Sequence, residues 1–177
     1  LQSFAKVGMQ KLRITGGEPS LRHDVTDIIA DATKIPSIKT IAMTSNGVLL
    51  DQKIKQWHAA GLNAINISVD SLNREHFHAI TGHDRLNTIM AGVEKALALP
   101  SLNVKLNAVL LRHLNDEQLP LWLEFIRTRN ISVRFIELMQ TGDNLDYFKN
   151  HHIAANTLQQ QLTAMGWQLQ TRAFEAG

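Results

Sequence analysis

The chain contains no cysteine among its 177 residues. This absence excludes disulfide bonds and thiolate-bound metal ions held by the chain itself. The sequence also lacks any apolar run near the roughly 18 residues that a membrane-spanning helix needs. No stretch has the pattern of a signal peptide. We therefore expect a cytoplasmic protein with no membrane contact.

The chain also lacks a large excess of charge of either sign. Eighteen Lys and Arg residues face 16 Asp and Glu residues, so the net charge is only +2, although the isoelectric point is about 9.1. So small an excess gives no reason to expect a nucleic-acid partner. The chain is 44% hydrophobic and 19% charged and has no interior linker, so we expect residues 1–177 to form a single domain.

Short apolar segments recur along the chain and alternate with helix-period segments. The expected strands cover 11–15, 40–45, 64–70, 103–111 and 132–138. The expected helices cover 24–34, 51–61, 86–99, 115–130 and 155–166, with a short extra helix in 71–82. Strands that alternate with helices are typical of βαβ units and a parallel sheet.

Three finer expectations concern the second half of the chain. Asn115 and Gln118 have the spacing of a capping box, which places a helix start at Asn115. Residues 140–156 are polar and read as a loop. Residues 167–174 could begin a further strand.

The expected strands carry polar side chains on one face. Lys11, Arg13 and Thr15 alternate with Leu12 and Ile14. The same alternation sets Asn66, Ser68 and Asp70 apart from their apolar neighbours, and likewise Lys105 and Asn107. Strands covered on both faces read as continuous apolar runs instead. Because a buried unpaired charge costs several kcal/mol, we expect helices on one face only and a wet, ligand-filled barrel interior on the other. A sheet with one solvated face is the alternative.

The strands end in small or polar residues, "TGGEP", "TSNG", "SVDS" and "IELMQ". The carboxyl ends of parallel strands are where α/β proteins place their sites. Gly16 and Gly17 free the backbone to approach a ligand closely. Glu18 would offer an anionic partner for an ammonium group. A plain turn would also explain this motif.

Together the segments "ITGGEPSLR", "MTSNGVLL", "INISVDSL", "VKLNAVLL" and "VRFIELMQTG" resemble the core of the radical S-adenosylmethionine enzymes. Within that superfamily, "VKLN" and "VRFIELM" are similar to the GTP cyclase family of molybdenum cofactor biosynthesis. The resemblance implies an α/β fold, a partial parallel (β/α)6 TIM-like barrel that lacks its first strand and its C-terminal part. It also implies that this barrel holds S-adenosylmethionine and GTP.

The resemblance also implies contacts, position by position. S-adenosylmethionine would contact Gly17, Ser68 and Met139, to which we add the turn residues Gly16 and Glu18. GTP would contact Lys11, Arg13, Thr44 and Lys105, with Arg134 beside it. Several cations in a confined site suit a triphosphate, and Arg forms bidentate phosphate contacts. Ser45 stands where the family commonly has a second Thr.

The iron–sulfur clusters of the family have no ligands here. The family holds one [4Fe–4S] cluster on a Cys-x3-Cys-x2-Cys loop, and the GTP cyclases hold a second on three further cysteines. Such clusters need cysteine thiolates, so we expect an inactive internal fragment of a parent lyase with two clusters. A binding domain that lost its clusters, or another radical enzyme, are the alternatives. The unpaired edge at 11–15 would favour a homodimer or aggregation.

Some residues invite other hypotheses. The eight histidines could suggest zinc, but their spacing favours surface positions and no metal ligand is assigned. Lys105 could suggest a Schiff-base aldolase, which the neighbouring motifs disfavour. Asp70 is an acid in the barrel interior or a cap at a strand end. Trp57 and Trp122 are expected to pack helices onto the sheet. No catalytic residue is assigned.

Overall fold

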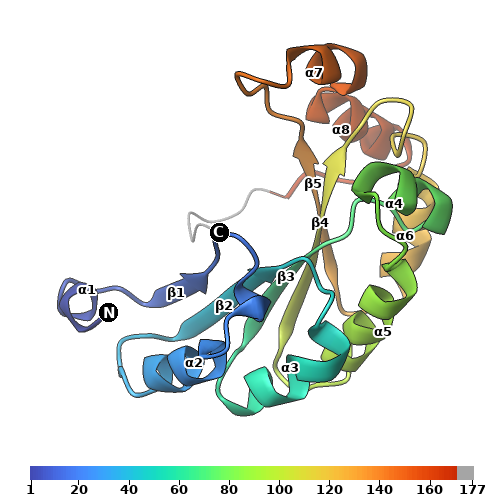
Figure 1. The fold of residues 1–177 in the computed structure, drawn as a ribbon. Coiled ribbons are helices and arrows are strands. Elements are labelled where there is room, and N and C mark those ends of the chain that lie inside the picture. Colours follow the sequence, from blue (N-terminus) through green and yellow to red (C-terminus); the bar gives the residue numbers. More distant parts are fainter. Residues whose placement is uncertain (171–177) are drawn as a thin grey trace.

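A computed structural model describes residues 1–170 of the chain. Its centre is one parallel sheet of five strands in the order β1-β2-β3-β4-β5 (Figure 1). The strands are β1 (Lys11–Ile14), β2 (Thr40–Ser45), β3 (Ala64–Ser68), β4 (Asn103–Leu110) and β5 (Ser132–Glu137). The α/β class and all five expected strands are therefore confirmed, with the ends of four strands shorter by one or two residues.

The helices follow the expected alternation. They are α1 (Gln2–Lys6), a 3-10 turn η1 (Pro19–Leu21), α2 (Val25–Thr33), α3 (Leu50–Ala59), α4 (Arg74–Thr81), α5 (Leu86–Leu97), α6 (Leu119–Arg127), α7 (Leu145–His151) and α8 (Ala155–Ala164). Helix α4 is the short extra helix, and Asn73 caps its start: the side-chain oxygen accepts hydrogen bonds from the N–H groups of Glu75 and His76. Within residues 1–170 no helix has the length and apolar character to cross a bilayer.

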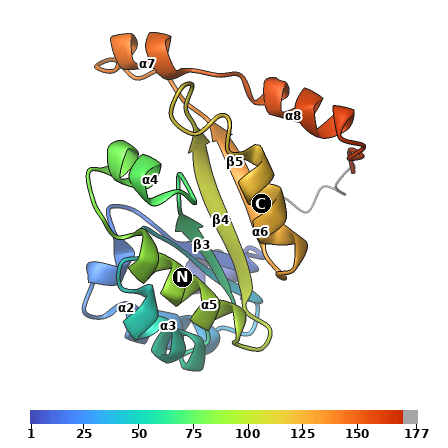
Figure 2. The ribbon, with the colours of Figure 1, turned by 90° about the vertical axis from the view of Figure 1, so that its right-hand side faces the viewer.

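The polar segment 140–156 is not only a loop, because it contains α7. Contacts with distant residues hold this helix. The carbonyl of its last residue, His151, accepts a hydrogen bond from the Arg112 N–H at 2.8 Å, and the ring of the next residue, His152, lies 2.8 Å from the Glu137 carboxylate. Seven residues are too few to show helical periodicity, so the sequence pattern missed α7. Figure 2 shows α7 and α8 beyond the carboxyl ends of β4 and β5.

The expected capping box is wrong. Helix α6 begins at Leu119 and has no side-chain cap. The Asn115 side-chain oxygen instead accepts from the Leu111 N–H at 2.7 Å, and its amide donates to the carbonyls of Asp70 and Val109 at 2.6 and 2.7 Å. Asn115 therefore ties the exit of β3 to the exit of β4.

Gln118, the second residue of that expected box, also bonds elsewhere. Its side-chain oxygen accepts from the Ser71 hydroxyl at 2.7 Å, and its amide nitrogen lies within hydrogen-bond distance of the His76 ring. Gln118 thus joins the start of α6 to the β3–α4 connection. Local spacing could not predict these partners, because they lie more than 40 residues away.

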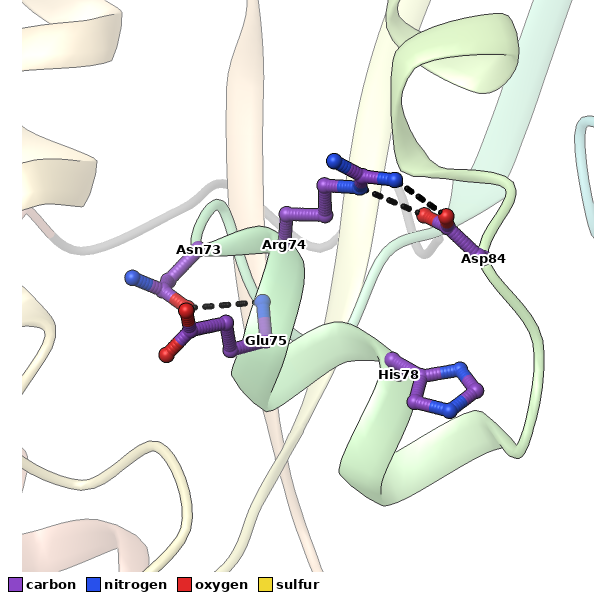
Figure 3. Close-up of a pocket in the computed structure, with 5 residues that line it drawn as sticks. All are labelled: Asn73, Arg74, Glu75, His78 and Asp84. Carbon is purple, nitrogen blue, oxygen red and sulfur yellow. Dashed lines mark hydrogen bonds and ion pairs between the residues drawn. The ribbon is translucent and has the colours of Figure 1, made fainter.

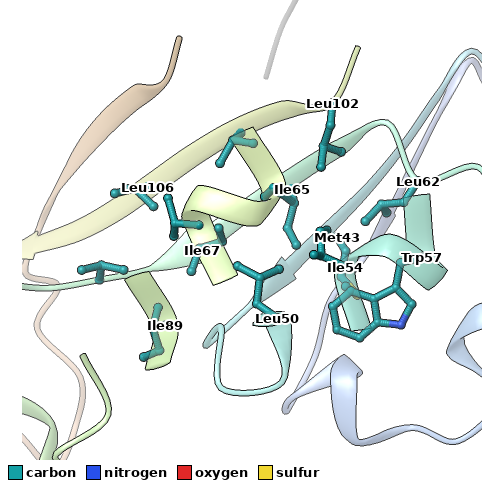
Figure 4. Close-up of a cluster of buried hydrophobic side chains, with 14 of the residues drawn as sticks. Met43, Leu50, Ile54, Trp57, Leu62, Ile65, Ile67, Ile89, Leu102 and Leu106 are labelled. Carbon is teal, nitrogen blue, oxygen red and sulfur yellow. The ribbon is translucent and has the colours of Figure 1, made fainter. Parts of the chain in front are cut away.

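The hydrophobic core lies on one face of the sheet (Figure 4). Its strand members are Ile41, Met43, Ile65, Ile67, Val104, Leu106 and Ala108, which alternate with the polar positions. Trp57 of α3 and Trp122 of α6 are each only 1% exposed and pack into this core, as expected. Figure 1 shows α2, α3, α5 and α6 along this side of the sheet. The polar positions of the strands contribute nothing to the two hydrophobic clusters of the described residues.

The end of the described chain adds no strand. Residues 167–170 have no regular secondary structure, and the rest of the expected strand, 171–174, lies outside the described residues.

Replacing Gly47 with alanine is expected to destabilise the fold more than replacing Gly82. Both glycines have a positive φ, +77° and +71°, so a side chain at either costs about 1–2 kcal/mol. A Cβ at Gly47 would also lie 2.8 Å from methyl groups of Ile67 and Ile89, whereas nothing lies within 4 Å at Gly82. Overpacking adds about 1–3 kcal/mol. Urea unfolding measures both variants, and equal losses would contradict the packing argument.

Candidate functional site

Parallel register arranges the expected GTP contacts in a diagonal band across the polar face. Thr44 pairs with Asn66, and Asn66 pairs with Lys105, so these three side chains form one row across β2, β3 and β4. Neighbouring strands lie about 4.8 Å apart. Arg13 lies on β1, one row nearer the amino ends, and Arg134 lies on β5, one row nearer the carboxyl ends. The fold thus places Arg13, Thr44, Lys105 and Arg134 on the same face of the sheet.

Lys11 lies farthest from this group. It pairs with Thr40 at the amino end of β2, two rows below Thr44. Lys11 and Arg13 are exposed, whereas Thr44, Lys105 and Arg134 are half-buried. The band therefore becomes more enclosed toward β4 and β5.

Two asparagines complete the polar face, and the sequence assigned them no role. Asn66 is 6% exposed between Thr44 and Lys105. Asn107 lies between Ser68 and Arg134 in the next row. Within the described residues its side-chain oxygen is buried and accepts no hydrogen bond. A buried polar atom without a partner is costly, so this oxygen could accept from a bound molecule. Alternation in the sequence already placed Asn107 on the polar face, but it could not reveal that this oxygen lacks a partner among the described residues.

The Gly16–Gly17 turn leaves open space for a ligand. Gly16 has φ +98° and Gly17 has φ +39°, in the region that only glycine enters easily. No atom lies within 4 Å of a Cβ built on either residue. The turn follows β1 at the carboxyl edge of the sheet, so its backbone is accessible to a ligand such as S-adenosylmethionine.

Glu18 is more constrained than its sequence suggested. One carboxylate oxygen accepts from the Ser45 hydroxyl at 2.8 Å and from the Ser20 N–H at 3.0 Å, and the other accepts from the Asn46 N–H at 2.7 Å. Burial raises the pKa of Glu18, but these hydrogen bonds outweigh burial and hold the pKa below its usual value. The carboxylate is therefore ionised and bonded within the protein.

The other expected S-adenosylmethionine contacts lie along the same edge. Ser68 is the last residue of β3 and is exposed. Met139 follows β5 by two residues and is 74% exposed. The Met139 carbonyl accepts a hydrogen bond from the Asn144 side chain at 3.1 Å. Gly16, Gly17, Ser68 and Met139 thus all lie at strand ends, although they come from three separate strands.

Asp70 caps a strand end. Its carboxylate accepts from the Val109 N–H of β4 at 2.9 Å, which confirms the cap hypothesis. Burial raises the pKa of Asp70, although the hydrogen bond from Val109 acts in the opposite direction. Burial also raises the pKa of Tyr147 in α7, and the Asp70 charge raises it further. Asp70 therefore interacts electrostatically with Tyr147 of α7, a neighbour that the sequence could not reveal.

Replacing Asp70 with asparagine is expected to lower the pKa of Tyr147. A nearby carboxylate opposes formation of a tyrosinate, so removing its charge makes the phenol ionise at a lower pH. Tyr147 is the only tyrosine of the chain, so an ultraviolet absorbance titration reports it alone. The exposed Asp146, next to Tyr147 in sequence, provides a matched control (Asp146→Asn) with a smaller expected shift. An unchanged titration in Asp70→Asn would contradict the coupling.

A surface hollow lies apart from the polar face and the strand ends. It measures about 520 Å³ and is lined by Asn73, Arg74, Glu75, His78 and Asp84, at the start of α4 and the α4–α5 connection (Figure 3). Arg74 and Asp84 pair through two hydrogen bonds there, and both side chains are half or more exposed. An exposed pair of this kind contributes little to stability. Residues 1–170 contain no cluster of His, Asp and Glu that could hold a metal ion.

Comparison with known proteins identifies the family of the chain. The model of the Radical SAM superfamily matches residues 1–126, which include the glycine turn and the first four strands. The chain belongs to the radical SAM superfamily. Membership implies S-adenosylmethionine and iron–sulfur chemistry.

Two curated relatives with high identity to the chain are both named "GTP 3′,8-cyclase". The chain is 53% identical over 177 residues to "GTP 3′,8-cyclase" of Stenotrophomonas maltophilia (strain K279a), which covers all of this chain and 54% of that protein. It is 48% identical over 176 residues to "GTP 3′,8-cyclase" of Yersinia pestis, which covers 99% of this chain and 54% of that protein. The chain thus spans about half the length of the curated relatives it matches.

Two solved structures share the fold. A domain of a pyruvate-formate lyase-activating enzyme from Bacteroides vulgatus ATCC 8482 superposes with a TM-score of 0.66 at 16% identity, over 89% of this chain and 94% of that chain. TYW1 with a lysine-pyruvate adduct superposes with a TM-score of 0.63 at 16% identity, over 88% of this chain and 49% of that chain. At this identity the likeness concerns the fold alone.

The radical SAM residues present fit one implied cofactor and not the other. The open glycine turn, with space where Cβ atoms would stand, fits the approach of S-adenosylmethionine. An iron–sulfur cluster needs thiolate ligands, and the chain has no cysteine. The chain itself therefore supplies no thiolate ligand for an iron–sulfur cluster.

Proposed function

We propose that this chain is the barrel part of a GTP 3′,8-cyclase, a lyase of molybdenum cofactor biosynthesis. The observation that carries the proposal is the polar band. Arg13, Thr44, Lys105 and Arg134 lie on the polar face of the sheet, and the chain matches proteins of that name along all or nearly all of its length. The sheet and its one-sided helices support a partial (β/α)6 barrel whose polar face lines the interior, in preference to a freely solvated face.

The protein's own residues would bind and orient two ligands in this barrel. The three cations of the band would neutralise the triphosphate of GTP, because confined positive charges and planar guanidinium groups suit phosphate oxygens. The carboxyl edge, with Gly16, Gly17, Ser68 and Met139, would hold S-adenosylmethionine. When bound, S-adenosylmethionine would supply the radical chemistry that starts the cyclisation of GTP, once one electron from a cluster held outside the chain cleaves it and releases methionine. Two [4Fe–4S] clusters belong to this proposal, with ligands outside the chain.

A nucleotide-binding domain without radical chemistry is the second candidate, and the lack of cysteine favours it for the isolated chain. Another radical SAM enzyme is disfavoured by the relatives, since both name the GTP cyclase. Whether the chain pairs with a second copy through the exposed edge of β1 stays a prediction.

Calorimetric titration of the chain with GTP and with S-adenosylmethionine tests the proposed ligands, with ATP as the control nucleotide. The proposal requires that both ligands bind and that GTP binds more tightly than ATP. The gene product that contains this chain should release 5′-deoxyadenosine only when GTP is present. Formation of 5′-deoxyadenosine with another substrate, but not with GTP, would reject the cyclase.

A further inference from the structure

We propose that Glu18 positions the Gly16–Gly17 turn by anchoring it to the loop after β2, and that it supports S-adenosylmethionine binding through this anchor and not by an ionic contact with the ligand. The inference rests on the proposed function, since the ligand of the turn is itself proposed. It departs from the expectation that the carboxylate would face an ammonium group.

The first observation is the set of partners. The Glu18 carboxylate accepts three hydrogen bonds within the protein, and two of the donors, the Ser45 hydroxyl and the Asn46 N–H, lie 27 and 28 residues away in sequence. The Ser45 oxygen also accepts from the Gly47 N–H at 3.0 Å. Glu18 therefore joins the exit of β1 to a loop that has its own internal hydrogen bonds.

The second observation is the side of the sheet on which the anchor lies. Along β2 the side chains alternate, and Ser45 follows Ile41 and Met43 on the face that the helices cover. Ser45 is only 2% exposed. Thr44, on the opposite side, belongs to the polar band. The Glu18 carboxylate is thus drawn toward the covered face and away from the face proposed to hold ligands.

The third observation is that the described residues place no atom against the Cβ side of the turn. Gly16 and Gly17 have no side chains, and nothing lies within 4 Å of where their Cβ atoms would stand. Glycine in such a turn loses more conformational freedom on ordering than any other residue. A fixed turn therefore needs a holder, and the ionised Glu18 makes charge-assisted hydrogen bonds, which are stronger than neutral ones.

Substitution of Ser45 distinguishes a Glu18 that anchors the turn from a Glu18 that contacts the ligand. Ser45 bonds to Glu18 under both hypotheses and touches the ligand under neither. The anchor predicts that Ser45→Ala weakens S-adenosylmethionine binding by about tenfold, the effect of one such hydrogen bond, and that Glu18→Gln does so as well. Ser45→Thr, which keeps the hydroxyl, should restore most of the affinity. Ser37→Ala is the matched control, since the Ser37 hydroxyl is buried and has no hydrogen-bond partner in the described chain.

Calorimetric titration of the chain with S-adenosylmethionine gives these affinities, and GTP titration of the same samples reports whether the variants are folded. If Ser45→Ala binds S-adenosylmethionine like Ser37→Ala while Glu18→Gln does not, Glu18 contacts the ligand directly and the inference fails. If Ser45→Thr does not restore binding, the hydroxyl is not the cause and the inference also fails.

If the wild-type chain does not bind S-adenosylmethionine, the proposed function fails on its own. The anchor is then judged by amide hydrogen exchange. The Asn46 N–H should exchange faster in Glu18→Gln than in wild type, with no change in Ser37→Ala. Unchanged exchange at Asn46 would overturn the anchor itself.

Discussion

Replacing Lys105 or Arg134 with alanine is expected to weaken GTP binding by about 1.5–3 kcal/mol, the range for hydrogen bonds to charged groups. The two residues lie on adjacent strands, one row apart on the same face. Both are half-buried. Partial burial removes some of the water that hydrates each charge, and the attraction of a bound polyanion would offset that cost. S-adenosylmethionine binding should change much less, because its proposed contacts lie at the carboxyl edge.

Calorimetric titration of each ligand against each variant measures this division. Lys53→Ala is a suitable control, because Lys53 is exposed on α3, which packs on the covered face. Thermal unfolding of all variants checks that the fold persists. GTP affinity unchanged by both substitutions, or an equal loss for both ligands, would reject the proposed division of the polar face.

Replacing Trp57 with alanine is expected to lower the free energy of unfolding by about 3–5 kcal/mol. Trp57 is 1% exposed in the main hydrophobic cluster, among Ile54 and Leu62 (Figure 4). The loss combines burial of a large aromatic surface with the cavity left behind. A loss of this size is a large part of a domain's total stability.

Trp167 provides the matched control for this experiment, because the same substitution there removes a side chain that is 50% exposed. Its expected cost is about 1 kcal/mol or less. Urea unfolding followed by circular dichroism compares the two, since tryptophan fluorescence would change with the substitutions themselves. Similar losses at both positions would mean that Trp57 is not the core residue that the structure shows.

The sheet could be predicted because its information is local. Alternation along each strand separated Lys105 and Asn107 from Val104 and Leu106, and the register of the structure keeps that separation across all five strands. Turn residues and helix periodicity placed most elements to within a few residues. The polar band of the candidate site follows from the same alternation.

The sequence could not predict contacts between distant segments. Glu18 looked like a residue for a ligand, yet its partners Ser45 and Asn46 lie across the strand ends. Asn115 fitted a capping box, yet it bonds the exits of two strands. In each case a polar side chain bonds to a partner distant in sequence and not to a neighbouring residue. Local sequence propensity cannot predict such hydrogen bonds, because they form only once the strands are paired.

The spatial order of the strands equals their order of synthesis. The strands begin at residues 11, 40, 64, 103 and 132, and each pairs only with the strand before it and the strand after it within the described chain. When each of β2 to β5 leaves the ribosome, the strand before it, with which it pairs, has therefore already been synthesised. Because pairing partners are close in sequence, little loop-closure entropy opposes each addition. The sheet can grow during translation from β1 toward β5, one βα unit at a time.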